Sequence, residues 1–228
     1  MAIKIGHAAS DEYNKANSGV AGDQTGRELY ILAWYSSPWD TVLRFKDAAK
    51  AEKAAKAMEA ACANDNIGYD QYQRNTLNDK AKAVGYDLAA ITEPCETDCS
   101  ALVTVCAQAA GIDIPYTSGN APWTGILAAQ FMSTGEFEEL KEARFLSSDA
   151  YLKRGDILLR TSGHVSMALE DGAETAKDTP ADWAEDAVEW ATANGIMLGD
   201  GKGNLRLKDN VTREEMMVFM HRMWNLMR

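Results

Sequence analysis

The ten residues 97–106, TDCSALVTVC, impose the most specific local structure on this chain. Asp98 is a favoured N-cap residue, and the apolar run after it predicts a helix whose first turn contains Cys99. Backbone N–H groups and the dipole at a helix N-terminus favour a thiolate, so Cys99 is a candidate nucleophile. The alternative is a cysteine that only fills the core, because free cysteines are among the most buried residues.

Composition and charge restrict the class of protein. The chain has 228 residues and a formal net charge of −11. This length supports one sizeable core, or one domain with a small appendage. The negative charge argues against nucleic-acid binding, which needs a basic surface. The apolar runs are too short to cross a membrane, and no signal peptide is visible at the start.

The cysteines and histidines do not form metal-binding motifs. None of the four cysteines has C-x-x-C spacing, and the three histidines lie far apart in the chain. We therefore predict no metal, no cofactor and no disulfide framework. Three cysteines are expected to be structural or incidental: Cys62, Cys95 and Cys106.

The N-terminal part predicts strands followed by helices. Residues 2–8, 28–35 and 41–45 are rich in branched and aromatic residues, which suit the strands of one sheet. Residues 47–63 are rich in alanine and lysine without glycine or proline, which predicts a helix. A second helix is expected over 69–84.

Two further strands are predicted over 155–160 and 164–170, with His164 at the start of the second. Asp171-Gly172 after it is a hairpin signal. Residues 173–180 are small, polar and charged, as in a linker.

The last predicted helix begins at Thr212, whose spacing from Glu215 is that of a capping box. The helix is rich in apolar residues over a wide arc, and this arc predicts either a loose local core or a surface for self-association. The residues concerned are Met216, Met217, Phe219, Met220, Met223, Trp224 and Met227.

Two passages together resemble a known family. Residues 98–103, DCSALV, resemble the Asp-Cys-Ser-Gly-Leu-Val signature of the NlpC family of papain-like cell-wall cysteine peptidases. Residues 155–158, GDIL, and 163–167, GHVSM, resemble the Gly-Asp-Leu-Val and Gly-His-Val-Gly-Ile strands of that family. Residues 21–26 and 67–77 resemble phage-encoded lysins of clostridia and related Gram-positive hosts.

The resemblance covers about residues 1–176 and implies an α+β fold, with a papain-like antiparallel sheet and packed helices. It implies that the Cys99 thiolate, held by His164 as an ion pair, attacks an amide carbonyl, and that His164 then protonates the leaving amine. Backbone N–H groups at the start of the Cys99 helix would hold the oxyanion. The implied substrate is the stem peptide of peptidoglycan, commonly at its D-Glu to diamino-acid bond.

The chain departs from the family at the residue that orients the histidine. The corresponding position is Ala176, which cannot form a hydrogen bond through its side chain. Residues 4–8, KIGHA, resemble the Lys-Phe-Ile-His-Ala strand of the family. We therefore expect a permuted arrangement, in which the N-terminal strands complete the sheet and His7 orients His164. Glu174, Thr175 or a backbone carbonyl are the alternatives.

The resemblance also suggests residues that contact the substrate. Tyr69 corresponds to a tyrosine that lines the site of the family, although Tyr86 is nearer in spacing to some members. Asp98 stands next to the nucleophile. Asp23 and Gln24 belong to a loop that would reach the substrate, or else form an ordinary polar turn.

Residues 177–228 resemble one S-layer homology module, through DWA at 182–184, GDG at 199–201 and VTREE at 211–215. The Phe-x-Pro of the family is replaced by LRL at 205–207. Such modules bind anionic secondary cell-wall polymers, a role suited to an arginine.

Arg213 and Trp183 are the expected wall-polymer ligands, and the alternative is that they cap a helix and fill a small core. Modules of this type usually act in threes. A homo-oligomer formed through the last helix would restore this number and supply avidity.

The sequence therefore predicts an endolysin: a papain-like cysteine hydrolase domain over 1–176 and a wall-binding module over 177–228. An N-acetylmuramoyl-L-alanine amidase is the alternative within this class, because related domains, including the CHAP family, cut either bond. A non-catalytic wall-binding or virion structural protein is the alternative outside it. We expect synthesis in the host cytoplasm, holin-mediated release and action at a Gram-positive wall, with no nucleic-acid or membrane partner.

Overall fold

The computed structural model describes residues 2–178, 180–200 and 204–227. The chain divides into unit 1, Met1–Gly172, and unit 2, Ala173–Arg228. The predicted linker over 173–180 is wrong in part, because α6, Ala173–Asp178, is a short helix. No described helix has the length and apolar character needed to cross a bilayer.

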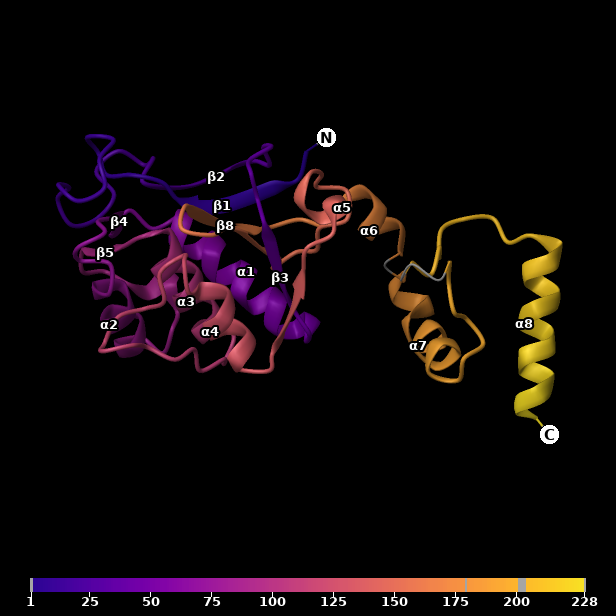
Figure 1. The fold of residues 1–228 in the computed structure, drawn as a ribbon. Coiled ribbons are helices and arrows are strands. Elements are labelled where there is room, and N and C mark those ends of the chain that lie inside the picture. Colours follow the sequence, from indigo (N-terminus) through magenta and orange to yellow (C-terminus); the bar gives the residue numbers. More distant parts are fainter. Residues whose placement is uncertain (1, 179, 201–203, 228) are drawn as a thin grey trace. The chain divides into compact units, whose positions relative to one another are not determined.

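Unit 1 is built on a six-stranded antiparallel sheet in the order β2-β1-β8-β7-β3-β6. Helices pack on this sheet, so the predicted α+β fold is confirmed (Figure 1). The strands are β1 (Lys4–Ala8), β2 (Leu29–Ala33), β3 (Thr41–Phe45), β6 (Phe137–Leu140), β7 (Ile157–Arg160) and β8 (His164–Ala168).

The N-terminal strands complete the sheet, as the permuted arrangement predicted. β1 pairs with β8, with Ile5 opposite Ala168 and Gly6 opposite Met167. Gly6 is required at this position, because a Cβ atom there would lie 2.6 Å from Cγ of Met58 in α1 (Ala48–Cys62). Close packing of α1 against β1 therefore fixes the strand that carries His7.

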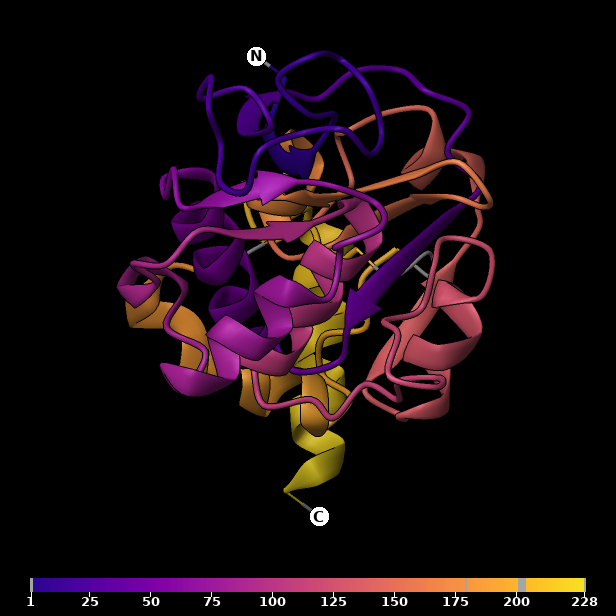
Figure 2. The same cartoon turned by 90° about the vertical axis from the view of Figure 1, so that its left-hand side faces the viewer.

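The core has two parts, one on each face of the sheet. α1 and α3 (Cys99–Ala109) lie on the same side of β1 and β8, and this face holds the larger apolar cluster (Figures 1 and 2). The opposite face holds a smaller cluster that includes Ile5, Trp39 and Phe145. The remaining helices of unit 1 are α2 (Thr76–Ala83), the 3-10 turn Leu88–Ala90, α4 (Leu127–Ser133) and α5 (Ala143–Leu146).

A two-stranded parallel ribbon leads into α3. β4 (Ile67–Tyr69) pairs with β5 (Cys95–Thr97), which ends two residues before Cys99. The helix predicted over 69–84 is therefore too long, since α2 begins only at Thr76. The carboxylate of Asp70 accepts the N–H groups of the second and third following residues, which turns the chain after β4.

The hairpin predicted at Asp171-Gly172 is also wrong. The turn that joins β7 to β8 lies at 161–163, and α6 follows Gly172 directly. Asp171 instead accepts the backbone N–H of Arg154, at 2.7 Å.

Unit 2 contains α6, the 3-10 turn Asp182–Ala184, α7 (Glu185–Ala193) and α8 (Arg213–Leu226). The predicted capping box of α8 is confirmed, since Thr212 and Glu215 exchange both hydrogen bonds. Among the side chains that the structure describes in unit 2, Ile196 is the buried one, at 5% exposure. The helices of this unit thus bury little apolar surface within the unit.

Candidate active site around Cys99

Cys99 is the first residue of α3, as predicted. Asp98 is the N-cap and accepts the backbone N–H of Ala101 at 2.7 Å. The Cys99 side chain is 8% exposed, and the backbone N–H groups of Ser100 and Val165 face its thiol. Val165 follows His164 in β8, so the nucleophile candidate and the histidine candidate meet where α3 begins.

His7 and His164 form a hydrogen-bonded pair. Their strands β1 and β8 are neighbours, and Nδ1 of His7 lies 2.8 Å from Nε2 of His164. Nδ1 is therefore the nitrogen of His164 that this bond leaves available. If Nδ1 is to accept a proton from the thiol, Nε2 of His164 carries the hydrogen and donates it to His7.

Aromatic rings surround the two imidazoles. Tyr30, the partner of His7 across β1 and β2, packs edge-on against His7 with ring centroids 4.6 Å apart. The Trp39 ring lies 6.3 Å from that of His164. These rings limit the rotation of both imidazoles and remove water from them, which lowers the local dielectric.

Burial favours the neutral forms of all three groups. It raises the pKa of the Cys99 thiol to about 12, with the Asp98 carboxylate adding to the effect. It lowers the pKa of His164 to about 4, with the charge of Arg160 contributing, and the pKa of His7 also to about 4. Burial thus opposes the thiolate that the helix dipole favours, because loss of solvation disfavours the charged form.

Arg74 ties the start of α3 to neighbouring loops. Its Nε forms an ion pair with Asp98 at 3.0 Å, and its Nη2 donates to Oγ of Ser100 at 2.8 Å and to the carbonyl of Pro122 at 3.2 Å. The guanidinium also lowers the pKa of the Cys99 thiol, against the larger effects of burial and Asp98. Arg74 thus connects the N-cap, the first turn of the helix and the loop before α4.

The other residues predicted to contact substrate are occupied within the protein. Tyr69 is buried at 4% exposure, and its hydroxyl accepts from Gln71 at 3.0 Å. The phenol is nevertheless close enough to Cys99 for Cys99 to add to the effect of burial in raising the pKa of Tyr69 to about 12. Tyr86 lies in the turn after α2, with φ of 64°.

The loop with Asp23 and Gln24 is an ordinary, strongly hydrogen-bonded turn. The Asp23 carboxylate accepts backbone N–H groups between Thr25 and Leu29, and the Gln24 amide donates to the carbonyls of Ala21 and Gly22. These contacts assign both side chains to holding the loop. The alternative that the sequence left open, a polar turn, is the one these contacts support.

Glu174 and Thr175, the side-chain alternatives to His7, come after β8 in the chain. Glu174 lies in α6, as does Ala176, and not in a strand of the sheet. The side chain of Thr175 lies outside the described residues.

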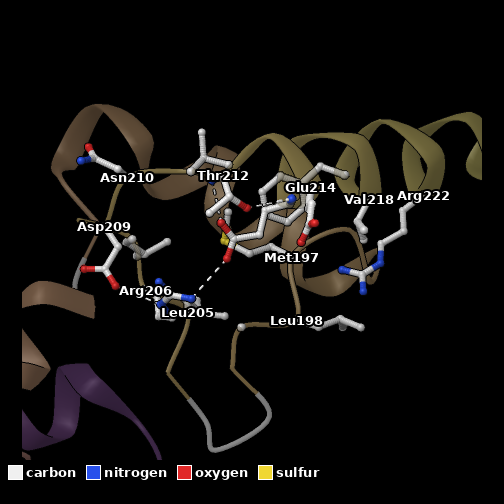
Figure 3. Close-up of a pocket in the computed structure, with 15 residues that line it drawn as sticks. Met197, Leu198, Leu205, Arg206, Asp209, Asn210, Thr212, Glu214, Val218 and Arg222 are labelled. Carbon is white, nitrogen blue, oxygen red and sulfur yellow. Dashed lines mark hydrogen bonds and ion pairs between the residues drawn. The ribbon is translucent and has the colours of Figure 1, made fainter.

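Unit 2 contains a pocket of about 610 Å³ between α8 and the loops after α7 (Figure 3). Arg206 and Arg222 line it, together with Asp209 and Glu215. Arg206 forms ion pairs with both acids, and Arg222 donates to the carbonyl of Ile196 at 2.8 Å. Trp183 and Arg213 do not line this pocket; Trp183 is 90% exposed, and Arg213 is exposed at the start of α8.

Comparison with models of protein families gives two matches. Residues 5–175 match the endolysin-like domain. This chain belongs to the endolysin-like family. Residues 176–217 match the S-layer homology domain. No curated protein and no solved structure gives a significant match.

The two matches indicate a peptidoglycan hydrolase that acts at the cell wall through a wall-binding S-layer homology domain. They place the Cys99, His164 and His7 constellation within the endolysin-like domain. The described residues contain no group of His, Cys, Asp and Glu side chains arranged to hold a metal ion.

Sequence reasoning missed two residues of the endolysin-like domain. Arg74 belongs to the run 67–77 that resembles phage lysins, but nothing in that run predicts its ion pair with Asp98. Glu96, three residues before Cys99, is 2% exposed, and the backbone N–H of Gly22 faces its carboxyl without meeting the geometry of a full hydrogen bond. Burial and the nearby carboxylates of Glu28 and Asp70 raise its pKa to about 8.

Proposed function

We propose that the endolysin-like domain is a cysteine hydrolase of the papain-like type, in which Cys99 attacks an amide bond of the peptidoglycan stem peptide. The observation that supports this most directly is the 2.8 Å bond between His7 and His164, beside a cysteine at a helix N-terminus. Together these residues supply a nucleophile, a base and a group that orients the base.

The proposed reaction starts from a neutral pair, because burial holds the thiol and the imidazole uncharged. As the sulfur attacks the carbonyl carbon, the thiol proton moves to Nδ1 of His164, and the imidazolium formed donates from Nε2 to His7. The negative oxygen of the tetrahedral intermediate accepts a hydrogen bond from the backbone N–H of Cys99, which lies in the first turn of α3 and has no intrahelical partner.

Collapse of this intermediate breaks the C–N bond, and the leaving amine takes the proton from His164. The acyl group remains on Cys99 as a thioester. A water molecule, deprotonated by His164, then attacks the thioester and regenerates the thiol. Proton transfer coupled to attack replaces the preformed ion pair expected from the family resemblance.

The proposed bond is the one between D-Glu and the diamino acid, and the bond between N-acetylmuramic acid and L-alanine is the second candidate. A non-catalytic protein is the candidate from another class. The raised pKa of Cys99 and its low exposure favour that last candidate, whereas a purely structural cysteine does not require the buried histidine pair beside it.

Digestion of purified clostridial peptidoglycan tests the proposal, with mass spectrometry of the released ends. The proteins compared are the wild type, Cys99→Ala and the control Cys95→Ala, which removes a buried thiol from β5. New amino termini within the stem peptide, made by wild type and Cys95→Ala only, would establish the peptidase. Free L-alanine termini with unsubstituted lactyl groups would establish the amidase. No release by the wild type would leave a binding protein.

For the S-layer homology domain we propose binding to an anionic secondary polymer of a Gram-positive wall, through Arg213 and Trp183. Their exposure supports this assignment. Sedimentation with walls before and after chemical removal of the polymer tests it, with Arg213→Ala and Trp183→Ala as variants. If the wild type fails to sediment with stripped walls but both variants still sediment with intact walls, the polymer is the ligand and residues other than Arg213 and Trp183 bind it. We further propose a phage origin with holin-mediated release, which follows from the lysin resemblance alone.

A further inference from the structure

Unit 2 leaves most of its large apolar side chains exposed. Ile196 is buried, whereas Trp190 is 53% exposed and Leu198 is 58% exposed. A helical unit gains most of its stability from packing an apolar face, and small repeat units commonly bury that face only against a neighbour. The exposed apolar face of unit 2 can therefore be buried only against a second apolar surface.

The apolar residues of α8 fall on two different faces. Successive residues of a helix are separated by 100°. Val218, Phe219 and Arg222 belong to the face that lines the pocket, beside the loops of the same unit (Figure 3). Met220 and Met223, with exposures of 57% and 44%, fall on a face about a third of a turn away.

The exposed face has the spacing of a coiled-coil seam. Met216, Met220, Met223 and Met227 follow one another at intervals of four, three and four residues, and these positions correspond to d, a, d and a of a heptad. All four are between 44% and 72% exposed. We call these four residues the methionine seam. The preceding a position is Arg213, the first residue of α8, so the apolar seam begins at Met216.

The exposed area suits an interface of modest size. The four residues of the methionine seam are between 44% and 72% exposed. Full burial of such a side chain removes about 60–120 Å² from water, so the seam offers about 130–260 Å² on each copy. This is well below the ~800 Å² per partner of a standard interface. A reversible association is therefore expected.

We propose that α8 associates with α8 of other copies of this chain through the methionine seam. A heptad seam is self-complementary, because each copy presents both the knobs and the holes that the other needs. Unit 1 offers no matching stripe among the described residues, since its exposed large apolar residues lie singly on separate elements, such as Ile31 in β2 and Met132 in α4. Methionine side chains adapt to one another in such a contact.

The association would place several S-layer homology domains in one assembly. Each domain would then bind the wall polymer at a high effective concentration once the first is bound. The mass of this assembly does not depend on the proposed hydrolase activity.

Sedimentation equilibrium of the full chain tests the proposal. The wild type is expected to show masses that are multiples of 24.9 kDa and rise with concentration. Met220→Glu/Met223→Glu places charges on the seam while keeping a good helix former, so it should remain a single chain. Asn225→Glu adds charge on the opposite side of α8 and should behave as the wild type. A monomeric wild type, or an unchanged mass for the double variant, would overturn the proposal.

A second measurement does not depend on a variant. Chains that contain photo-methionine are prepared with light and heavy nitrogen, mixed and irradiated. Cross-links between a light and a heavy α8 peptide are expected. Cross-links from α8 to unit 1 within one chain, without mixed pairs, would show that the seam is covered by the same chain and would overturn the proposal.

Discussion

Nδ1 of His7 and Nε2 of His164 lie 2.8 Å apart, although 157 positions separate the two residues in the chain. The first strand of the protein reaches the histidine strand because β1 inserts between β2 and β8. The first strand of the chain thereby carries His7, the residue that we propose orients His164.

We expect His7→Ala to lower kcat/KM for peptidoglycan hydrolysis by roughly 10- to 150-fold. A hydrogen bond to a group that becomes charged is worth about 1.5–3 kcal/mol, and each 1.36 kcal/mol corresponds to a tenfold change in rate. His7→Asn places an amide oxygen near the position of Nδ1 and should restore part of the loss. Unchanged kcat/KM in His7→Ala would show that another group orients His164.

The acid limb of activity should lie near pH 4 and not near 6.5. In the proposed mechanism the neutral form of His164 accepts the thiol proton, and burial lowers the pKa of His164 to about 4. kcat/KM measured on a soluble stem-peptide substrate should therefore persist as the pH falls below 6 and decline as it passes through about 4. An acid limb at 6.5 would mean that the imidazole is solvated in the working enzyme.

The lowered pKa values of His7 and His164 also predict that the protein loses stability in acid. His7 and His164 have folded-state pKa values of about 4, below the ordinary value of 6.5. Between these values the unfolded chain binds more protons than the folded one, so their contribution to the free energy of unfolding decreases as the pH falls from 6.5 to about 4. Urea unfolding of wild type and His7→Gln at pH 7 and pH 5 checks this, because the variant should lose less stability over the interval.

Much of the site could be predicted from local patterns. Asp98 as an N-cap and the apolar run after it predict a helix that begins at Cys99, and the strand pattern places His164 at the start of a strand. The proximity of His7 required the family resemblance, because pairing between strands far apart in sequence is not encoded locally. The charge state of Cys99 could not be predicted, since it depends on burial by the whole domain.

The parts that sequence reasoning missed depend on contacts between distant loops. α2 is shorter than its helix-forming composition suggested, because the Asp70 turn and the β4–β5 ribbon take the residues before Thr76. The ion pair between Arg74 and Asp98 joins segments that are 24 residues apart. No periodicity or capping signal marks such a pair.

Arg74→Met should destabilise the protein and slow the reaction. The Asp98 side chain is 9% exposed and would remain buried without its ion-pair partner, which typically costs about 3–5 kcal/mol. Loss of the guanidinium should also raise the pKa of Cys99 further, so kcat/KM should fall. Urea unfolding and steady-state kinetics measure the two effects.

Two further variants serve as controls for Arg74→Met. Lys80→Met breaks an exposed ion pair with Glu93 and should change neither quantity appreciably. Arg74→Met/Asp98→Asn removes the unpaired charge and should recover part of the stability. Equal stability of Arg74→Met and wild type would show that the ion pair does not hold the start of α3.

Glu96→Gln should stabilise the protein at alkaline pH. The folded-state pKa of Glu96 is about 8, against an ordinary value of 4.5, because the carboxyl is buried and faces Glu28, Asp70 and Glu12. Between these two values the folded chain binds more protons than the unfolded one, so the free energy of unfolding decreases as the pH rises, until Glu96 is ionised in both states.

The stability of wild type and Glu96→Gln is compared between pH 6.5 and 9, above the folded-state pKa of about 4 of both His7 and His164. Over this interval wild type should lose more stability than Glu96→Gln, by on the order of 1–2 kcal/mol. Glu142→Gln, at an exposed position before α5, serves as the control and should follow the wild type. If the free energy of unfolding changes with pH in the same way for wild type and Glu96→Gln, Glu96 is ionised in the folded protein between pH 6.5 and 9. The β5 strand before Cys99 would then tolerate a buried charge.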